Sequence, residues 1–406
     1  MVDDAGRDMT TRRDYVKYGG SILGGALLAG CSGGQSADPT AESTTTTTTA
    51  SESTPTPAES SYTVTMAPMG EVEFEGVPET IFTRLTHLAG MAFALGRGSD
   101  VNALHAPDYY DALWNQFTPR LPGVELDWTG RYSSWNVSKE KLYELDSDVH
   151  LADPASVLAL DEWGMGDIEE IRENVAPWFG NTFSNAHKSP PEAYADRYEY
   201  YTLWEQFEKV SQVFREEAKY EALAEIHDDV MATVEADLPA SDARPGIVMG
   251  GFSDPSAPYV YNVDTPGYLT AHVRPFQPVD AFGDDVESGA RVDMEALAEA
   301  NPDVILVFGG LHPSTDISEI RSSLEDDPVG STIPAVENGR IYPQGGRYQG
   351  PVLNLFQLEM TAKQLYPDTF GEWPEYAEGP YPELPESEQF FDRQRVADII
   401  NGEFEA

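Results

Sequence analysis

The segment from Tyr194 to Leu238 carries no strand signal and separates two regions in which short apolar runs alternate with helical patterns. Inside this segment, apolar residues such as Leu203, Phe207 and Val210 recur at the spacing of one helix face. Alternating strands and helices on either side are typical of parallel sheets. The sequence therefore predicts an α/β protein of two lobes with mainly parallel sheets, joined by one long backbone helix over residues 194–240.

Each lobe contains elements that can be assigned from periodicity. In residues 62–193 the predicted strands are 63–66, 72–74, 80–84, 101–104 and 148–152, and the predicted helices are 88–95, 139–145 and 168–175. In residues 241–406 the predicted strands are 246–250, 302–308 and 339–342, and the predicted helices are 293–300 and 353–365. The apolar run from Val304 to Phe308 is typical of a strand that is buried on both faces of its sheet.

The first thirty-one residues have the features of an export leader. A pair of arginines, Arg12 and Arg13, precedes a weakly apolar run that is too short to cross a bilayer permanently. This pattern is typical of a twin-arginine signal. The run ends in Leu-Ala-Gly-Cys, which resembles a lipobox, so Cys31 is the predicted site of lipid attachment. Residues 1–31 are therefore predicted to be a twin-arginine lipoprotein signal.

Residues 32–61 consist almost entirely of serine, threonine, alanine, glycine, proline and glutamate. Such a composition offers no apolar surface to bury and predicts a disordered tether. No later segment is apolar enough over sufficient length to span a membrane. We expect the region after residue 61 to be a globular domain held beside a membrane by its lipid anchor.

The sequence contains 70 acidic and 25 basic residues, which gives a net charge of −45. Because this charge would repel itself unless concentrated salt screened it, the composition indicates a halophilic protein. It argues against a nucleic-acid partner, whose phosphates would be repelled along most of the surface. Cys31 is the only cysteine, so disulfides and thiolate metal sites are excluded.

Known catalytic motifs are missing. The segment from Gly251 to Asp254 lacks the second glycine of a nucleophile elbow, and neither His-Glu-x-x-His nor a phosphate loop occurs. The seven histidines include no pair at metal-ligand spacing, although residues distant in sequence can still converge on a bare metal ion. We therefore predict that the protein is not an enzyme, with no catalytic residue, no cofactor and no bound metal of its own.

Candidate ligand contacts are sought in the loops after strands, because ligands bind beyond the carboxyl ends of the strands in open parallel sheets. Residues 130–135, 308–313 and 345–350 are such loops, and residues 253–280 form a long segment after another strand. Arginine forks fit anionic oxygens, and aromatic rings cover bulky groups. The alternative is that these side chains are structural. The candidates are Arg131, Tyr132, Trp135, Tyr259, Tyr268, Arg274, His312, Arg347 and Tyr348.

Several motifs occur in an order that points to a known family. Val77-Pro78 precedes the first predicted core strand, and Leu95-Gly96 ends the helix after it. Leu297 to Ile305 reads Leu-Ala-Glu-Ala-Asn-Pro-Asp-Val-Ile ahead of a strand of the second lobe. Over residues 62–385 the sequence resembles the substrate-binding lipoproteins of ABC importers for iron-siderophores, haem and cobalamin.

This resemblance implies that a rigid helix bridges the lobes, that ligand binds in the cleft between them, and that a membrane permease receives it. We therefore expect a monomeric, lipid-anchored solute-binding protein on the extracellular face of the membrane. It would capture a ferric chelate, such as an iron-siderophore, and deliver it to an ABC transporter permease.

Several alternatives stay open at this point. They are receptors of the same family for haem, cobalamin or a metal ion, a two-lobed secreted enzyme, and a tethered sensor. Haem would need an axial ligand, for which His312 or Tyr348 would serve. The candidate arginines argue against cobalamin, which would prefer a nearly uncharged cleft.

Overall fold

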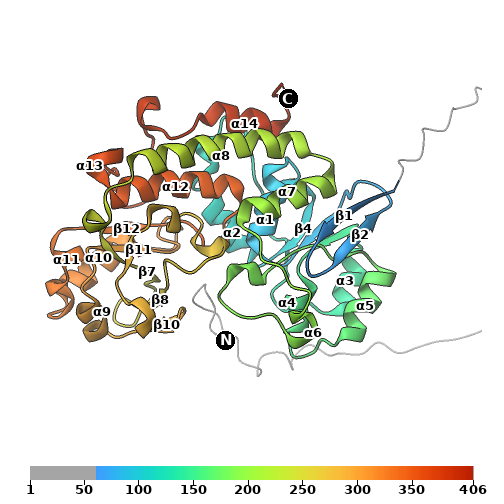
Figure 1. The fold of residues 1–406 in the computed structure, drawn as a ribbon, viewed down its shortest axis with the longest axis horizontal. Coiled ribbons are helices and arrows are strands. Elements are labelled where there is room, and N and C mark those ends of the chain that lie inside the picture. The colour runs from blue at the N-terminus through green and yellow to red at the C-terminus, as the bar shows by residue number, and fades with distance from the viewer. Residues whose placement is uncertain (1–60, 406) are drawn as a thin grey trace, which may run out of the picture. The chain divides into compact units, whose positions relative to one another are not determined.

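The computed structural model describes residues 61–405 (Figure 1). The predicted export signal with Arg12 and Arg13, the predicted lipidation site Cys31, and residues 32–60 of the predicted tether lie outside the described residues. Within the described part of the chain, no helix combines the length and the apolarity that crossing a bilayer requires.

The first lobe contains a four-stranded sheet in which every strand pair is parallel, as predicted. Its strands are, in spatial order, β5 (Tyr132–Ser133), β4 (Val101–Leu104), β3 (Ile81–Thr83) and β6 (Val149–Leu151). The predicted strands 63–66 and 72–74 precede this sheet as β1 (Tyr62–Met66) and β2 (Gly70–Phe74), which pair antiparallel. The helices of this lobe are α1 (Thr86–Ala94), α2 (Pro107–Trp114), α3 (Lys139–Leu145), α4 (Pro154–Leu158), α5 (Met165–Asn174) and α6 (Glu192–Ala195).

The second lobe contains a mixed sheet in the order β10-β8-β7-β11-β12, with β9 paired to β7. The pairs of β7 with β11, β11 with β12 and β7 with β9 are parallel, whereas β8 pairs antiparallel with β7 and β10. Its strands are β7 (Gly246–Gly251), β8 (Tyr259–Tyr261), β9 (Val279–Asp280), β10 (Ala290–Arg291), β11 (Val304–Val307) and β12 (Ile341–Pro343). Its short helices are α9 (Met294–Ala300), α10 (Ile317–Asp326) and α11 (Pro334–Glu337).

The predicted single helix between the lobes is interrupted. The structure has two helices, α7 (Leu203–Phe214) and α8 (Glu217–Asp237). Arg215 has a φ of 53°, in the left-handed region, and its N–H bonds to carbonyls of the last turn of α7. This is a usual way for a helix to end. The apolar spacing continues past Arg215, so periodicity alone does not reveal the break.

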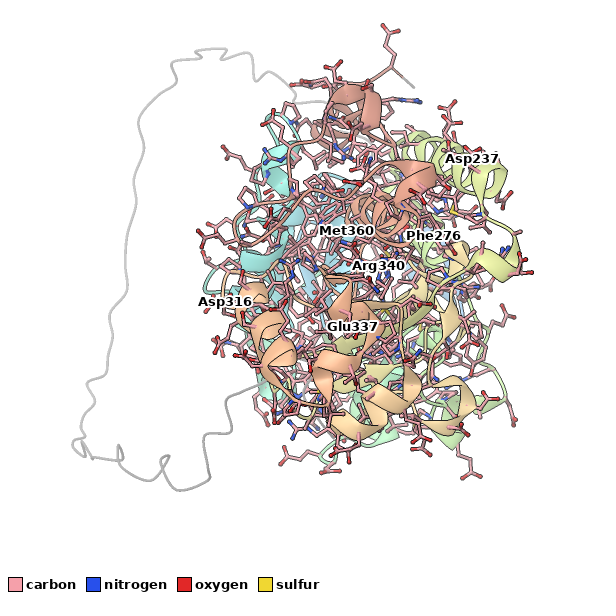
Figure 2. All side chains as sticks on the ribbon, turned by 90° about the vertical axis from the view of Figure 1, so that its left-hand side faces the viewer. Asp237, Phe276, Asp316, Glu337, Arg340 and Met360 are labelled. Atoms are coloured by element: carbon pink, nitrogen blue, oxygen red, sulfur yellow. The ribbon has the colours of Figure 1, made fainter. Side chains whose placement is uncertain are left out.

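Helix α12 (Pro351–Leu365) is buried at every position and packs against α1, α7 and α8. Figure 1 shows α8 and α12 running beside one another. The side chain of Met360 of α12, which is labelled in Figure 2, is fully buried. Arg340 donates hydrogen bonds to the Gln364 and Leu365 carbonyls, at 3.2 and 3.0 Å, and so neutralises the carboxyl end of α12.

The chain after α12 folds back over the lobes. It contains α13 (Pro367–Phe370) and α14 (Arg393–Asn401), and α14 contacts α8. This last segment holds a buried carboxylate, Glu359 of α12, through Arg393 and Tyr381. The burial of Glu359 on α12 therefore depends on the segment that follows this helix.

Candidate ligand-binding site

Aromatic rings from the two lobes meet where strands of both sheets end. The ring of His87 stacks on Tyr268 with centroids 4.3 Å apart, and Tyr348 lies 6.1 Å from His87. Tyr109 of α2 stacks on His312 at 4.1 Å, with the rings almost parallel. These five residues are called the inter-lobe junction below. His87 follows β3, His312 follows β11 and Tyr348 follows β12, so the junction lies beyond carboxyl ends of strands, as predicted for a ligand site.

A glycine permits the close approach at one side of the junction. Gly309 has a φ of 64°, and a Cβ atom there would lie 2.6 Å from the Tyr109 hydroxyl oxygen. Both the backbone conformation and the lack of space therefore require glycine at this position. The loop that carries His312 can consequently lie directly against α2.

A buried arginine stands beside the junction. Arg84, immediately after β3, is 7% exposed, and its guanidinium lies 5.2 Å from the Trp135 ring centroid. Its hydrogen bonds to the Ser156 hydroxyl and the Trp135 carbonyl are long, at 3.5 and 3.4 Å, and its Nε has no partner among the described residues. Burial lowers the pKa of Arg84, and Tyr348 and Asp153 oppose this effect. The guanidinium therefore keeps donor capacity for an anion.

Asp153 supplies the opposite charge. Its carboxylate accepts hydrogen bonds of 2.8 Å from the Ala155 N–H, the Thr182 N–H and the Tyr198 hydroxyl. Burial nevertheless raises the pKa of Asp153 to about 6. Through these hydrogen bonds Asp153 fixes the start of α4 and the segment around Thr182. The negative charge of its carboxylate also attracts Arg84.

His87 is the least satisfied polar group of the junction. It is fully buried, and neither ring nitrogen has a hydrogen-bond partner among the described residues. Desolvation lowers the pKa of His87 to about 3, so the ring is neutral near pH 7. An unpartnered buried polar group calls for an explanation, and a ligand that bonds to it supplies one.

Arg347 lies behind the rings of the second lobe. Its side chain is 7% exposed, and its guanidinium carbon is 3.5 Å from the Tyr261 ring centroid and 5.8 Å from that of Phe308. Together with Arg84 it places a second buried cation near the carboxyl ends of the strands.

Five of the predicted residues gather in this region. Tyr268, His312 and Tyr348 belong to the junction itself, Trp135 contacts Arg84, and Arg347 lies behind the second-lobe rings. Their grouping follows from the topology, because four of them come directly after β5, β11 or β12.

The other four predicted residues lie elsewhere. Arg131 precedes β5 and donates to the Ser99 carbonyl at 3.3 Å, so it stands at the amino end of that strand. Tyr132 lies in β5 with Lys141 over its ring. Tyr259 is part of β8, inside the sheet, and carries Arg291 over its ring. Arg274 lines a separate hollow.

The sequence prediction missed Arg84, His87 and Tyr109. Arg84 is the last residue of the predicted strand 80–84, and His87 is the second residue of the helix after it. The rule that was applied to three later loops would have selected both, since they also follow a core strand. Tyr109 lies on α2, a helix that was not predicted, so no signal placed it.

A metal-ligand cluster does not occur in the part of the chain that the structure describes. No group of three His, Cys, Asp or Glu side chains there is arranged to hold a metal ion. The junction offers rings and neutral imidazoles, and two arginines lie next to it, which together suit a ligand that brings its own charge.

Acidification should destabilise the protein through three fully buried histidines, His87, His150 and His272. Desolvation lowers the pKa of each from 6.5 to about 3. The unfolded chain therefore takes up protons below pH 6.5 that the folded protein does not, so stability that is present above pH 6.5 is lost as the pH falls towards 3. Between pH 7.5 and 5.5 each histidine should cost about 1.4 kcal/mol.

Asp153 acts in the opposite direction, because its raised pKa gives stability as the pH falls from about 6 towards 3.8. The histidine contribution is therefore isolated by comparing wild type with His87→Gln in urea unfolding at both pH values. The variant should lose about 1.4 kcal/mol less than wild type. An equal loss in the two proteins would contradict the assignment.

Two α/β lobes with aromatic and basic side chains at their facing strand ends define a two-lobed solute-binding protein. The sequence profile of the family described as periplasmic binding protein matches residues 134–347. The chain belongs to this family. It is a solute-binding protein of an ABC transporter, it works outside the cytoplasm, it is not an enzyme, and it binds its ligand without a cofactor.

Solved structures have the same fold. A periplasmic binding protein from Veillonella parvula is 14% identical, with 80% of this chain and 95% of that one covered and a TM-score of 0.53. The iron uptake ABC transporter substrate-binding protein PiuA of Streptococcus pneumoniae is 18% identical, with 74% and 97% covered and a TM-score of 0.50. CeuE of Helicobacter pylori, solved with nickel and histidine, is 14% identical, with 76% and 90% covered and a TM-score of 0.50. No curated protein matches the chain.

Proposed function

We propose that the protein captures a ferric chelate, of the iron-siderophore class, at the inter-lobe junction and delivers it to a membrane permease. The observation that carries this proposal is the pair of buried arginines, Arg84 and Arg347, beside rings from both lobes. In a chain with a net charge of −45, buried cations at strand ends favour an anionic ligand.

The chemistry of a ferric chelate fits these groups. Its anionic oxygens can accept from guanidinium forks, and its bulky organic rim can lie against Tyr268, Tyr348 and Trp135. The name of PiuA, an iron uptake protein with this fold, agrees with the proposal. Because His87 and Tyr268 are in ring contact across the lobes, the lobes must separate to admit such a ligand.

Haem is the second candidate. His87 has two buried ring nitrogens without a partner among the described residues, and Tyr348 lies 6.1 Å away. Either side chain could serve as an axial ligand to haem iron. The two arginines would then pair with the propionates. Cobalamin is less favoured, because it carries less negative charge than haem for pairing with the two arginines.

We also propose the attachment and the domain division that the sequence predicts. Residues 1–31 would be a twin-arginine signal that is removed when Cys31 receives lipid, and residues 32–61 would tether a monomeric receptor to the extracellular face. The lobes would comprise residues 62–193 and 241–406, with residues 194–240 between them. The acidic surface would keep the protein soluble in concentrated salt.

The proposed function predicts selective stabilisation by one ligand class. The protein is heated in concentrated salt with ferric hydroxamate, ferric catecholate, haem, cobalamin or free metal ions. A ligand at one hundred times its dissociation constant should raise the free energy of unfolding by about 2.7 kcal/mol. Stabilisation by a ferric chelate supports the proposal. Stabilisation by haem together with a new haem absorption band supports the second candidate. If no ligand raises the unfolding temperature, both are contradicted.

Substitutions at the junction should weaken the chelate selectively. Arg84→Gln removes a charged donor, so affinity should fall about tenfold or more, since hydrogen bonds to charged groups contribute about 1.5–3 kcal/mol. Tyr348→Leu should also weaken binding. Arg131→Gln is the matched control, because Arg131 lies at the amino end of β5 and should leave the dissociation constant unchanged. Equal effects of Arg84→Gln and Arg131→Gln would place the ligand elsewhere.

A further inference from the structure

A hollow of about 530 Å³ lies outside the junction, where the lobes also meet. One wall consists of residues 184–189 of the first lobe and residues 200–205 at the start of α7, and the other contains Gly267 and Arg274 of the second lobe. Contact between the walls separates the hollow from the junction. The Tyr268 hydroxyl donates to the Thr182 carbonyl at 3.0 Å, and a Cβ atom on Gly267 would lie 2.5 Å from the Asn185 carbonyl oxygen.

Two cations of this hollow form no ion pair within the described residues. Arg274 and Lys188 make no ion pair or side-chain hydrogen bond with any described residue, and the Nε of Arg274 is buried without a partner. Elsewhere in the described chain, cations such as Lys139 and Arg172 pair with the abundant carboxylates. Burying a donor without a hydrogen-bond partner costs free energy, because the donor loses its hydrogen bond to water. A bound acceptor would offset this cost.

The other lining groups limit the ligand further. Glu205 contributes a carboxylate, but this group accepts the Thr202 N–H at 2.7 Å as part of the cap of α7. Tyr200 is 59% exposed and presents a ring beside the cations. The hollow is of the size that holds a small organic molecule. Its lining combines two positive charges and one capping carboxylate with aromatic surface.

We propose that this hollow is a second binding site, for a small organic oxyanion that carries a carboxylate or phosphate group. The oxyanion would accept from the Arg274 guanidinium and the Lys188 ammonium, and its organic part would lie against Tyr200. Because the walls belong to both lobes, a bound oxyanion stabilises the arrangement in which they are together. Binding at this site needs no iron, so it can be tested independently of the proposal that the protein binds a ferric chelate.

The test is calorimetric titration of the full chain, without iron, at constant chloride concentration. The probes are 4-hydroxybenzoate, succinate and inorganic phosphate, which separate an aromatic carboxylate, an aliphatic carboxylate and a phosphate source. We expect saturable binding of at least one of them. Arg274→Gln and Lys188→Gln should each weaken that binding about tenfold, the loss of one charge-assisted contact.

Two controls keep the result interpretable. Lys188 is exposed and makes no ion pair or hydrogen bond within the described chain, so Lys188→Gln should fold normally even if Arg274→Gln does not. Arg131→Gln removes a cation far along the first-lobe sheet and should leave binding unchanged. The proposal is overturned if no probe binds saturably, or if Lys188→Gln binds as tightly as wild type.

Discussion

Replacement of Arg393 by alanine should lower the free energy of unfolding by about 3–5 kcal/mol, the usual cost of removing one partner of a buried ion pair. Its partner Glu359 is completely buried on α12, and the Arg393 side chain is 10% exposed. The carboxylate also accepts the Tyr381 hydroxyl at 2.6 Å and the Phe390 N–H at 2.7 Å. These neutral donors would remain, but the negative charge would be left uncompensated.

The arginine contributes packing as well as charge. Its guanidinium carbon lies 3.7 Å from the Phe391 ring centroid and 4.3 Å from that of Phe356. Arg393→Lys should therefore lose less stability than Arg393→Ala, because it keeps the charge but not the planar stack. Urea unfolding at pH 7.5 measures both.

A surface pair provides the matched control for this prediction. Arg172 and Glu169 form an ion pair in which both side chains are about half exposed. Arg172→Ala should cost between 0 and about 1 kcal/mol. If Arg393→Ala and Arg172→Ala destabilise the protein equally, Glu359 is not held as a buried charge in solution.

Gly90→Ala should be the second severe substitution. Gly90 lies on α1 against Gly350, the residue before α12. A Cβ atom on Gly90 would lie 2.3 Å from the Trp114 ring and 2.8 Å from the Gly350 Cα. Since one neighbour is backbone and the other is a fully packed indole, both must move. Overpacking of this kind costs about 1–3 kcal/mol.

The same substitution should disturb ligand binding. Helix α1 begins two residues after Arg84 and contains His87, and α12 begins three residues after Tyr348. A separation of α1 from α12 would therefore move both sides of the junction. We expect lower thermal stability together with weaker binding of the ferric chelate, measured by thermal unfolding and by titration.

Gly166→Ala is the control for Gly90→Ala. Gly166 lies in α5, and a Cβ atom there would meet nothing within 4 Å. Alanine in an exposed helix should be neutral or should stabilise by up to about 1 kcal/mol. A loss at Gly166 as large as that at Gly90 would contradict the explanation by steric overlap between α1 and α12.

The fold could be predicted from the sequence because its signals are local. The parallel strands β3, β4 and β6, the buried β11 and the helices α1, α3, α5, α9 and α12 follow from apolar periodicity, whereas α2, α4 and α10 were not predicted. The break at Arg215 could not be predicted, because a left-handed residue leaves no mark in the apolar spacing. The short strands β8 and β10 were missed for a related reason, since two or three residues are too few to show alternation.

The site could be predicted only in part, because its geometry depends on where each strand begins. Trp135 and Tyr348 follow their strands and reach the facing ends, whereas Arg131 precedes β5, a strand of two residues. An error of a few residues in the predicted position of this strand therefore assigned Arg131 to the wrong edge of the sheet. Arg84 and His87 show the reverse case, because the same rule applied to β3 would have found them.

The most direct test of the central claim is the position of the iron atom. Crystals of the protein with a ferric chelate are measured at the iron absorption edge, where iron alone gives a strong anomalous signal. The account predicts one iron position between the lobes, enclosed by Arg84, His87 and Tyr348, with the rings of His87 and Tyr268 moved apart. An iron atom outside the inter-lobe junction, for example in the hollow beside Arg274, would contradict it.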